Sequence, residues 1–319
     1  MNQSLADNLG ATPAPLAMDT GVATVAAATA DRGTTSDMAA TPAAPHAGVV
    51  PPAAPPLLEL VNVWKRFGEA PRQMVAVTQV NLKIAPGEFV TLVGPSGCGK
   101  STLFNMIAGL LAPDSDGSVL FGGAPQRDGQ LLGKVSFMPQ RDLLFPWRTV
   151  LDNAILALEV EGTPRREARE RAEAMLPEFG LTGFGKHYPH QLSGGMRQRV
   201  ALMRTFLFER DLLLLDEPFG ALDALTRTRM QHWLLDLWTR HRRTVLFITH
   251  DIDEAIYLGD RVLVMTARPG TVKSEQRITL PRPRDPAIVT TPEFVKIKRH
   301  LLDEIEEESR KSFMQEEQA

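Results

Sequence analysis

Short apolar runs recur along the chain from residue 57 onward, and their patterns predict two kinds of strand. Residues 57–63 and 75–84 are rich in alternating apolar and polar positions, which is typical of paired strands with one buried face. We expect these two segments to form an antiparallel ribbon. Four later runs are almost continuously apolar, as in parallel strands buried on both faces; they cover residues 89–93, 212–215, 245–248 and 262–265.

Helical periodicity fills the gaps between these runs. Within residues 164–179, apolar side chains recur at helical spacing along one face, while arginine and glutamate occupy the other positions. Residues 225–238 show the same pattern. Strands that alternate with helices predict an α/β fold around a largely parallel sheet.

The two ends of the chain differ in amino-acid composition from this central region. Residues 1–56 are crowded with alanine, threonine and proline, so we expect a disordered tail, because repeated proline prevents regular helices and strand ladders. Residues 57–280 then form one domain. Residues 281–319 are highly charged and carry a helix-spaced apolar stripe, which predicts a helix that packs back on its own domain. The stripe consists of Phe294, Ile297, Leu301 and Ile305.

The composition narrows the class of protein. Apolar residues make up 43% of the 319 residues, which is enough for a sizeable core. The net charge of -3 argues against a dedicated nucleic-acid binder, and Cys98 is the only cysteine, so no intrachain disulfide can form. No apolar run approaches the ~18 residues of a membrane helix and no secretory signal pattern precedes the domain, so we expect a cytoplasmic protein.

A glycine-rich segment follows the predicted strand at residues 89–93 and opens a helix. Glycines let successive backbone N–H groups surround phosphate oxygens, and a helix N-terminus adds positive potential. Lys100 is expected to reach the β- and γ-phosphates and the Ser101 hydroxyl to ligate Mg²⁺, which predicts a nucleotide-binding site. We call this segment the phosphate loop; it consists of Gly94, Pro95, Ser96, Gly97, Cys98, Gly99, Lys100, Ser101 and Thr102.

Two further segments carry residues suited to phosphate or metal. Ser193, Gly194 and Gly195 begin another predicted helix, so that a hydroxyl and two amide groups form a second anion-binding helix start. Asp216 and Glu217 follow the four leucines of residues 212–215, at the strand end where α/β sheets bind ligands. Buried carboxylates there are costly without a cation, which argues against a simple acidic turn.

Residues 192–199, Leu-Ser-Gly-Gly-Met-Arg-Gln-Arg, resemble the signature motif of ABC ATPases, and residues 212–218 resemble their Walker B strand. The resemblance implies a P-loop NTPase fold of ABC type, with an antiparallel β subdomain and a helical subdomain that carries the signature motif. It also implies ATP and Mg²⁺ as cofactors and a head-to-tail homodimer, in which the signature motif completes the partner's ATP site. Asp216 would hold Mg²⁺ through water, and Glu217 would polarise the attacking water.

Other motifs of the family follow in its usual order across residues 57–280. Gln140 in Phe-Met-Pro-Gln matches the Q-loop, which touches the metal or water and faces the membrane subunit. Asp223 in Ala-Leu-Asp matches the D-loop, which crosses the dimer interface, and His250 in Phe-Ile-Thr-His-Asp matches the switch histidine, which contacts the γ-phosphate. Phe67 is the candidate for the aromatic residue that stacks on adenine; Trp64 competes with it, and a core role is an alternative for either ring.

Residues 141–153 and 266–270 are similar to segments of ATPases from nitrate, sulfonate, taurine and pyrimidine-precursor importers. The similarity implies an ATPase held on the cytoplasmic side of the inner membrane by a separate permease, with a periplasmic or extracellular solute-binding protein in the full complex. An exporter ATPase is an alternative, because exporters and importers have the same ATP-hydrolysing domain. Another alternative is a soluble ABC ATPase acting on DNA or ribosomes. Such ATPases carry either a long coiled-coil or zinc insertion or two cassettes in one chain, and this sequence has neither feature.

Two local hypotheses concern apolar and thiol side chains. Residues 143–147, Leu-Leu-Phe-Pro-Trp, form a bulky apolar run in a proline-broken loop, and we expect it to form an exposed groove for a cytoplasmic helix of the permease. The alternative is that Phe145 and Trp147 fill the core. We expect Cys98 to be a small residue that fills the phosphate loop; the alternative is that backbone N–H groups of the loop lower the pKa of its thiol.

Overall fold

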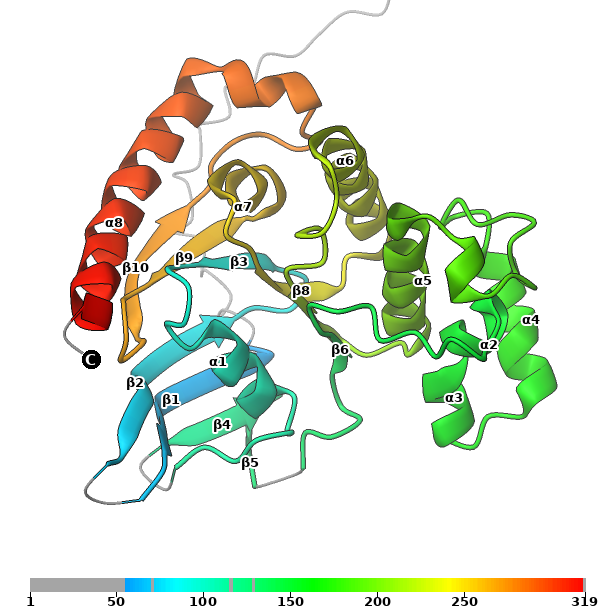
Figure 1. The fold of residues 1–319 in the computed structure, drawn as a ribbon, viewed down its shortest axis with the longest axis horizontal. Helices are drawn as coiled ribbons and strands as arrows, with labels where there is room; N and C mark the ends of the chain where they lie inside the picture. The colour runs from blue at the N-terminus through cyan, green and yellow to red at the C-terminus, as the bar shows by residue number, and fades with distance from the viewer. Residues whose placement is uncertain (1–54, 70–71, 115–116, 128–129, 318–319) are drawn as a thin grey trace, which may run out of the picture. The chain divides into compact units, whose positions relative to one another are not determined.

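The computed structural model describes residues 55–69, 72–114, 117–127 and 130–317, and residues 1–54 of the predicted tail lie outside this part of the chain. The described residues form two sheets, one of four strands and one of six. Figure 1 shows the smaller sheet, which contains β1, β2, β4 and β5, next to the larger sheet, with α1 near both. The predicted α/β fold with an antiparallel β subdomain is confirmed.

The four-stranded sheet contains the predicted ribbon. β1 and β2 are antiparallel and pair from Leu58 opposite Ile84 to Phe67 opposite Met74. β4 and β5 extend the sheet beyond β1, but they are too short for their alternation to stand out in the sequence. The spatial order is β2-β1-β4-β5, with bounds β1 Leu58–Phe67, β2 Met74–Ile84, β4 Ser118–Phe121 and β5 Ala124–Gln126.

The six-stranded sheet contains the four apolar runs as its central strands, and every residue of those strands is buried. All neighbouring strands are parallel except β10, which pairs antiparallel with β9. The pattern misses β6 and β10, because β6 has three residues and β10 is a polar edge strand. The order is β10-β9-β3-β8-β7-β6, with bounds β3 Phe89–Val93, β6 Ser136–Met138, β7 Leu212–Asp216, β8 Thr244–Ile248, β9 Arg261–Met265 and β10 Val272–Arg277.

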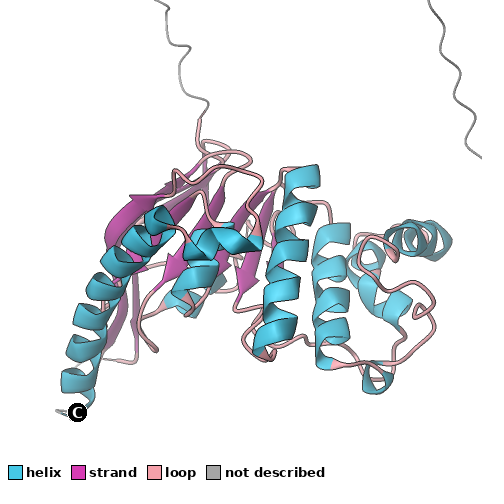
Figure 2. Cartoon of the chain, turned by 90° about the horizontal axis from the view of Figure 1, so that it is seen from above, coloured by secondary structure: helices cyan, strands magenta, loops and turns pink. Residues whose placement is uncertain are grey.

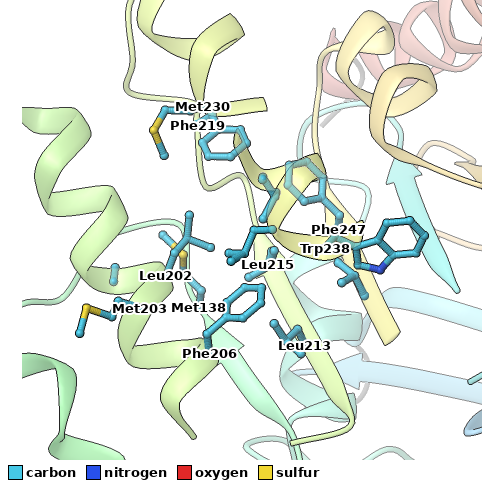
Figure 3. Packing of buried hydrophobic residues seen from close by; sticks show 14 of the residues in the cluster. Met138, Leu202, Met203, Phe206, Leu213, Leu215, Phe219, Met230, Trp238 and Phe247 are labelled. Carbon is cyan, nitrogen blue, oxygen red and sulfur yellow. The ribbon is translucent and has the colours of Figure 1, made fainter. Parts of the chain in front are cut away.

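Side chains alternate between two cores on the two faces of this sheet. Leu213 and Leu215 of β7 pack with Leu202, Phe206 and the other helical side chains shown in Figure 3, whereas the intervening leucines of β7 face the antiparallel sheet and α1. A strand buried on both faces must be apolar at every position, which is why these strands read as continuous runs.

Helices cover both faces of the six-stranded sheet. α1, Lys100–Ile107, lies on the face shared with the antiparallel sheet. The other helices pack on the opposite face or form the helical region seen to one side of the strands in Figure 2. Their bounds are α2 Val150–Ala154, α3 Leu156–Val160, α4 Arg165–Met175, α5 Gly194–Leu207, α6 Ala224–His241, α7 Ile252–Leu258 and α8 Pro292–Glu317, with short 3-10 helices at Pro189–Gln191 and Pro286–Thr290.

The charged C-terminal segment contains α8, which lies along the domain near β9, β10 and α7 (Figure 1). Phe294 and Leu301 of its apolar stripe are fully buried in the core, and Ile297 and Ile305 pack against it. Burial of this stripe fixes the helix on the domain through the hydrophobic effect. Within the described ranges, no helix combines the length and the apolar character needed to cross a membrane.

Candidate functional site

A cavity of about 580 Å³ lies where the parallel strands end. The phosphate loop follows β3, Glu217 follows β7, His250 follows β8 and Gln140 follows β6. Because parallel strands bring their carboxyl ends to one edge of the sheet, residues far apart in the sequence meet at this cavity. Its lining residues are Phe67, Met74, Ala76, Gly94, Ser96, Gly97, Gly99, Lys100, Ser101, Thr102, Gln140, Glu217, His250 and Arg268.

The phosphate loop owes its shape to glycine. Gly97 and Gly99 have φ values of +72° and +107°, in the region that other residues rarely adopt. A Cβ on Gly99 would come within 2.9 Å of the Ala76 carbonyl oxygen, so a side chain there would collide with β2. Lys100 begins α1, and its Nζ donates to the carbonyl oxygens of Gly94 at 2.9 Å and Pro95 at 2.8 Å. The loop therefore has the shape of a phosphate-binding loop, and the ammonium group of Lys100 is held inside it.

Two members of the phosphate loop, Pro95 and Cys98, are not among the cavity-lining residues. The side chain of Cys98 is only 1% exposed and packs with the apolar core near β2 and α1. Burial raises the pKa of its thiol, and this outweighs the opposing charge of Lys100. The alternative that the loop lowers the pKa of Cys98 is therefore wrong, because loss of hydration destabilises the thiolate more than the nearby donors stabilise it. Cys98 fills space beneath the loop.

Asp216 lies at the end of β7, is 6% exposed, and accepts a hydrogen bond from the Ser101 side chain. The pKa of Asp216 is raised, because burial outweighs the hydrogen bond from Ser101 and the charge of Lys100. An ionised carboxylate in this position requires a cation beside it. A hydroxyl oxygen, a carboxylate and the amide oxygen of Gln140 are ligands that Mg²⁺ accepts, so the donor set fits this ion.

The side chains of Gln140 and His250 both lie next to the Glu217 carboxylate in the cavity. Gln140 Nε2 donates to Glu217 Oε2 at 3.0 Å, and His250 Nδ1 lies 3.3 Å from the same oxygen. The backbone of Glu217 has φ +44°, a strained value for a residue with a side chain, and its N–H donates to the Ile248 carbonyl oxygen of the next strand. The turn after β7 thus aims this carboxylate at the cavity, where it can accept a proton or orient water.

The far wall of the cavity, formed by β1 and β2, includes Phe67 and Met74. Phe67 is 37% exposed, and Lys65 Nζ lies 5.8 Å from its ring centroid, so part of the ring is open to stacking on an aromatic base. Trp64 does not line the cavity; its Nε1 donates to Asn62 Oδ1, and the Arg66 guanidinium covers its ring. Of the two aromatic candidates, the structure places Phe67 at the cavity.

Sequence reasoning did not assign Met74, Ala76 or Arg268 to the site, although all three line the cavity. Met74 and Ala76 lie on β2, where nothing in the alternating pattern distinguishes them from other strand residues. Arg268 follows β9, the neighbour of β3, so its place after a parallel strand was a usable signal.

Ser193, Gly194, Gly195 and Asp223 lie outside the cavity-lining set. Ser193 caps α5, with its hydroxyl accepting from the Met196 N–H, and both Ser193 and Gly194 are exposed. Asp223 caps α6 by accepting from the Thr226 N–H, and this hydrogen bond lowers the pKa of Asp223. Ser193 and Gly194 therefore form an exposed helix start that does not line the cavity of the phosphate loop.

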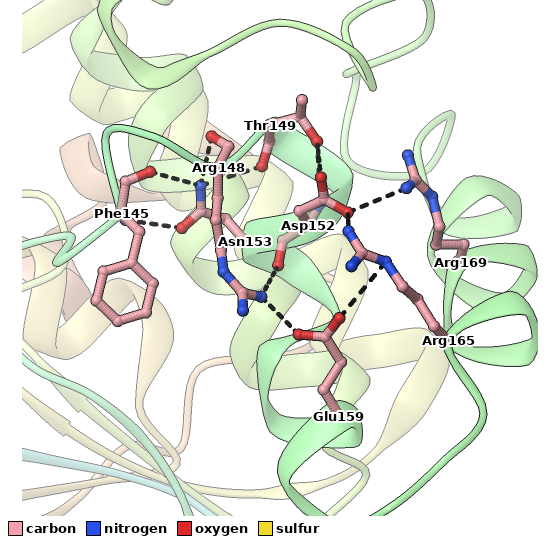
Figure 4. Close-up of polar contacts among 8 residues, drawn as sticks. All are labelled: Phe145, Arg148, Thr149, Asp152, Asn153, Glu159, Arg165 and Arg169. Atoms are coloured by element: carbon pink, nitrogen blue, oxygen red, sulfur yellow. Dashed lines mark hydrogen bonds and ion pairs between the residues drawn. The ribbon is translucent and has the colours of Figure 1, made fainter.

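Residues 143–147 form an exposed aromatic loop beyond Gln140. Trp147 is 71% exposed and stacks on Phe145 with ring centroids 5.1 Å apart, whereas Leu144 is buried. The exposure of Trp147 excludes its placement in the core. Figure 4 shows how fully buried Asn153 holds the loop: it accepts from the Phe145 N–H and donates to the carbonyl oxygens of Phe145, Arg148 and Thr149.

Comparison with known proteins gives consistent matches. A family model described as ABC transporter matches residues 77–220. The aliphatic sulfonates import ATP-binding protein of Bacillus subtilis is 42% identical over 242 residues, which are 76% of this chain and 91% of that protein. An uncharacterized ABC transporter ATP-binding protein of Methanocaldococcus jannaschii is 44% identical over 255 residues, 80% of this chain and 93% of that protein.

The solved structures include a dimeric bacterial ABC transporter cassette that is 34% identical to this chain. The two superpose with a TM-score of 0.61 over 70% of this chain and 99% of the cassette. A second structure of a cassette with the same identity, coverage and TM-score is described as a dimeric post-hydrolysis state bound to ADP and Pi.

Proposed function

Because the chain belongs to the ABC transporter family as an ATP-hydrolysing subunit, we propose that it powers the import of a small solute through a separate membrane permease. The observation that carries the proposal is the exposed aromatic loop, residues 143–147, which directly follows cavity residue Gln140. It connects the ATP site to a surface suited to another protein. Within the predicted nitrate, sulfonate or taurine type of solute, the relatives named for import of aliphatic sulfonates support a sulfonate.

In this proposal each group of cavity residues has its own role in ATP hydrolysis. The N–H groups of the phosphate loop and Lys100 bind the β- and γ-phosphates. Ser101, Asp216 and Gln140 are the residues that would hold Mg²⁺, and the bound ion would supply positive charge where phosphate charge develops. Glu217 orients the attacking water and accepts its proton, while His250 contacts the terminal phosphate from the next strand. Phe67 stacks on the adenine ring.

The exposed helix start at Ser193 and Gly194 supports a head-to-tail homodimer. An anion-binding helix start that faces away from its own phosphate loop can complete the phosphate site of a second copy. In this arrangement Asp223, at the beginning of α6, lies where the two copies meet. The dimeric cassettes that resemble this chain support the same assembly.

The permease holds the ATPase at the cytoplasmic face of the membrane in this proposal. The side chains offered to it are those of Trp147, Phe145 and Leu143, of which Trp147 and Leu143 are largely exposed. Aromatic anchors of this kind dominate binding energy at protein interfaces. A solute-binding protein on the other side of the membrane delivers the solute.

Reconstitution tests the proposal. The neighbouring genes are first searched for a permease and a solute-binding protein. The protein and that permease are then placed in proteoliposomes with the ATPase facing outward and the solute-binding protein inside, and movement of taurine or an alkanesulfonate is measured with ATP. We expect ATP-dependent transfer from the side of the solute-binding protein to the side of the ATPase, absent with Glu217→Gln. Transfer in the opposite direction would identify an exporter, and intact ATP hydrolysis with no solute transfer in either direction would overturn the transport function.

A further inference from the structure

The loop of residues 266–271, between β9 and β10, connects three parts of the molecule. Its Arg268 side chain reaches the phosphate loop, its Gly270 backbone pairs with β2, and its Ala267 N–H is bound by α8. Since β9 and β8 flank β3 on opposite sides, this loop approaches the phosphate loop from the side away from His250.

Arg268 is a cation with unusually weak partners. Its Nε and Nη2 donate to the Gly97 carbonyl oxygen at 3.2 and 2.9 Å, and Nη1 lies 3.3 Å from the Met74 sulfur. None of the ion pairs found among the described residues involves Arg268, and the side chain is exposed in the cavity wall. A guanidinium bonds much more strongly to phosphate oxygens than to a neutral carbonyl or a thioether.

The backbone of the loop is fixed on the side of β2. Gly270 N–H donates to the Ala76 carbonyl oxygen at 3.0 Å, and Thr78 N–H donates to the Gly270 carbonyl oxygen at 2.9 Å. A Cβ on Gly270 would lie 1.9 Å from the Cys98 carbonyl oxygen, so the loop packs directly against the phosphate loop. The position of residues 266–271 is therefore fixed relative to both β2 and the phosphate loop.

The other anchor is Glu308, which is 1% exposed although it belongs to a charged helix. Its Oε2 accepts from the Ala267 N–H at 2.9 Å, and its Oε1 pairs with Lys273 at 2.9 Å and Lys311 at 2.8 Å. Burial alone would raise the pKa of Glu308, but the hydrogen bonds from Lys311, Lys273 and Ala267 lower it overall, so the carboxylate is ionised at neutral pH. A buried carboxylate used on the backbone next to Arg268 has a positioning role.

We propose that Arg268 binds the phosphate chain of the nucleotide and that α8, through Glu308, positions the loop that carries Arg268. The proposal rests on the cavity being the ATP site. On nucleotide binding, the guanidinium exchanges its contact with Gly97 for a phosphate oxygen, while Glu308 keeps the backbone of residue 267 in place.

Equilibrium binding of ATP, ADP and adenosine to the full-length protein tests the role of Arg268. We expect Arg268→Gln to weaken ATP binding about tenfold, because a charge-assisted hydrogen bond is lost, and to flatten its dependence on salt. Adenosine affinity stays unchanged, and Arg268→Lys retains part of the ATP affinity. The matched control is Arg166→Gln, which removes an exposed arginine of α4 that is distant in sequence from every cavity segment.

The outcomes separate this inference from the assignment of the site. ATP affinity lost in Lys100→Ala but unchanged in Arg268→Gln overturns the role of Arg268 alone. Equal loss of ATP and adenosine in Arg268→Gln also overturns it, because the side chain would then support the cavity generally. ATP binding unchanged in both variants overturns the ATP site itself.

A double-mutant cycle tests Glu308. We expect Glu308→Ala to weaken ATP binding in the otherwise unchanged protein and to cause no further loss when Arg268 is already glutamine, because Glu308 acts through Arg268. If Glu308→Ala does not fold, Glu308→Asp serves instead, since it keeps the charge for the lysines and withdraws the oxygen from Ala267. Additive losses, or a Glu308 variant with unchanged ATP affinity, overturn the positioning role.

Discussion

Gln140 Nε2 donates a 3.0 Å hydrogen bond to Oε2 of Glu217, although the two residues are 77 positions apart in the chain. His250 Nδ1 lies 3.3 Å from the same carboxylate oxygen. The three residues follow β6, β7 and β8, which are adjacent in the sheet. One carboxylate oxygen therefore lies close to side chains from two neighbouring strand ends, with Gln140 as a hydrogen-bond donor.

Glu217→Gln is expected to bind ATP without hydrolysing it. The substitution removes the group that accepts a proton from water but leaves the phosphate loop and Asp216 intact, so turnover falls by at least ~10²-fold. Size-exclusion chromatography with ATP should then show a long-lived dimer. A variant that hydrolyses ATP at the normal rate would place the catalytic base elsewhere.

Lys100→Ala and Asp216→Asn are expected to fail at an earlier step. Each removes a charge that faces phosphate or metal, so loss of MgATP affinity or of turnover should be nearly complete. The measurements are nucleotide binding by fluorescence and phosphate release, with circular dichroism to check the fold. Normal values of both quantities in either variant would contradict the assignment.

Trp147→Ala is expected to separate transport from hydrolysis. Because Trp147 is 71% exposed, its removal should leave the melting temperature and basal ATPase rate unchanged, while permease association weakens by ~2 kcal/mol or more. The matched control is Trp238→Ala, which empties a site that is 1% exposed and should destabilise the fold by ~3–5 kcal/mol. A large fall in the melting temperature of Trp147→Ala would contradict its role as a surface anchor.

Cys98 is expected to react slowly with iodoacetamide in the native protein. Its thiol is buried and its pKa is raised by that burial, so little thiolate is available to the reagent at neutral pH. Mass spectrometry should show fast modification only after addition of denaturant. Rapid modification of the folded protein would show that the phosphate loop opens readily.

Glu254 is expected to make stability depend on pH. It is 4% exposed, and burial raises its pKa from 4.5 to about 7, with the Asp251 charge adding to the effect. Between these values the folded protein binds one more proton than the unfolded chain, so its stability falls as pH rises from about 4.5 through 7.

Denaturant unfolding at pH 5 and pH 8 measures this dependence. Glu254→Gln stays neutral and keeps an oxygen for the Gln231 hydrogen bond. From pH 5 to pH 8 its free energy of unfolding should therefore rise by up to ~3 kcal/mol relative to that of the natural protein. Glu173→Gln, at an exposed position of α4, is the control and should show no such gain. Equal pH dependence in Glu254→Gln and the natural protein would contradict the raised pKa.

The amino-acid sequence alone determined the α/β class, the central strands and the position of the phosphate loop. The four apolar runs specify buried parallel strands, because burial on both faces admits few polar residues, and the glycines at 97 and 99 specify a backbone shape that other residues rarely adopt. These features are local, so a short segment contains all the information that they require.

Only the tertiary structure decided which residues share the cavity and which do not. Phe67 faces it while Trp64 does not, and Cys98 is buried although it lies within the phosphate loop. The place of Arg268 after a parallel strand is a signal in the sequence, but Arg268 joins the site only because the strand order puts β9 beside β3. Contacts of this kind depend on how distant segments pack, and burial then sets the pKa of each group through its loss of hydration.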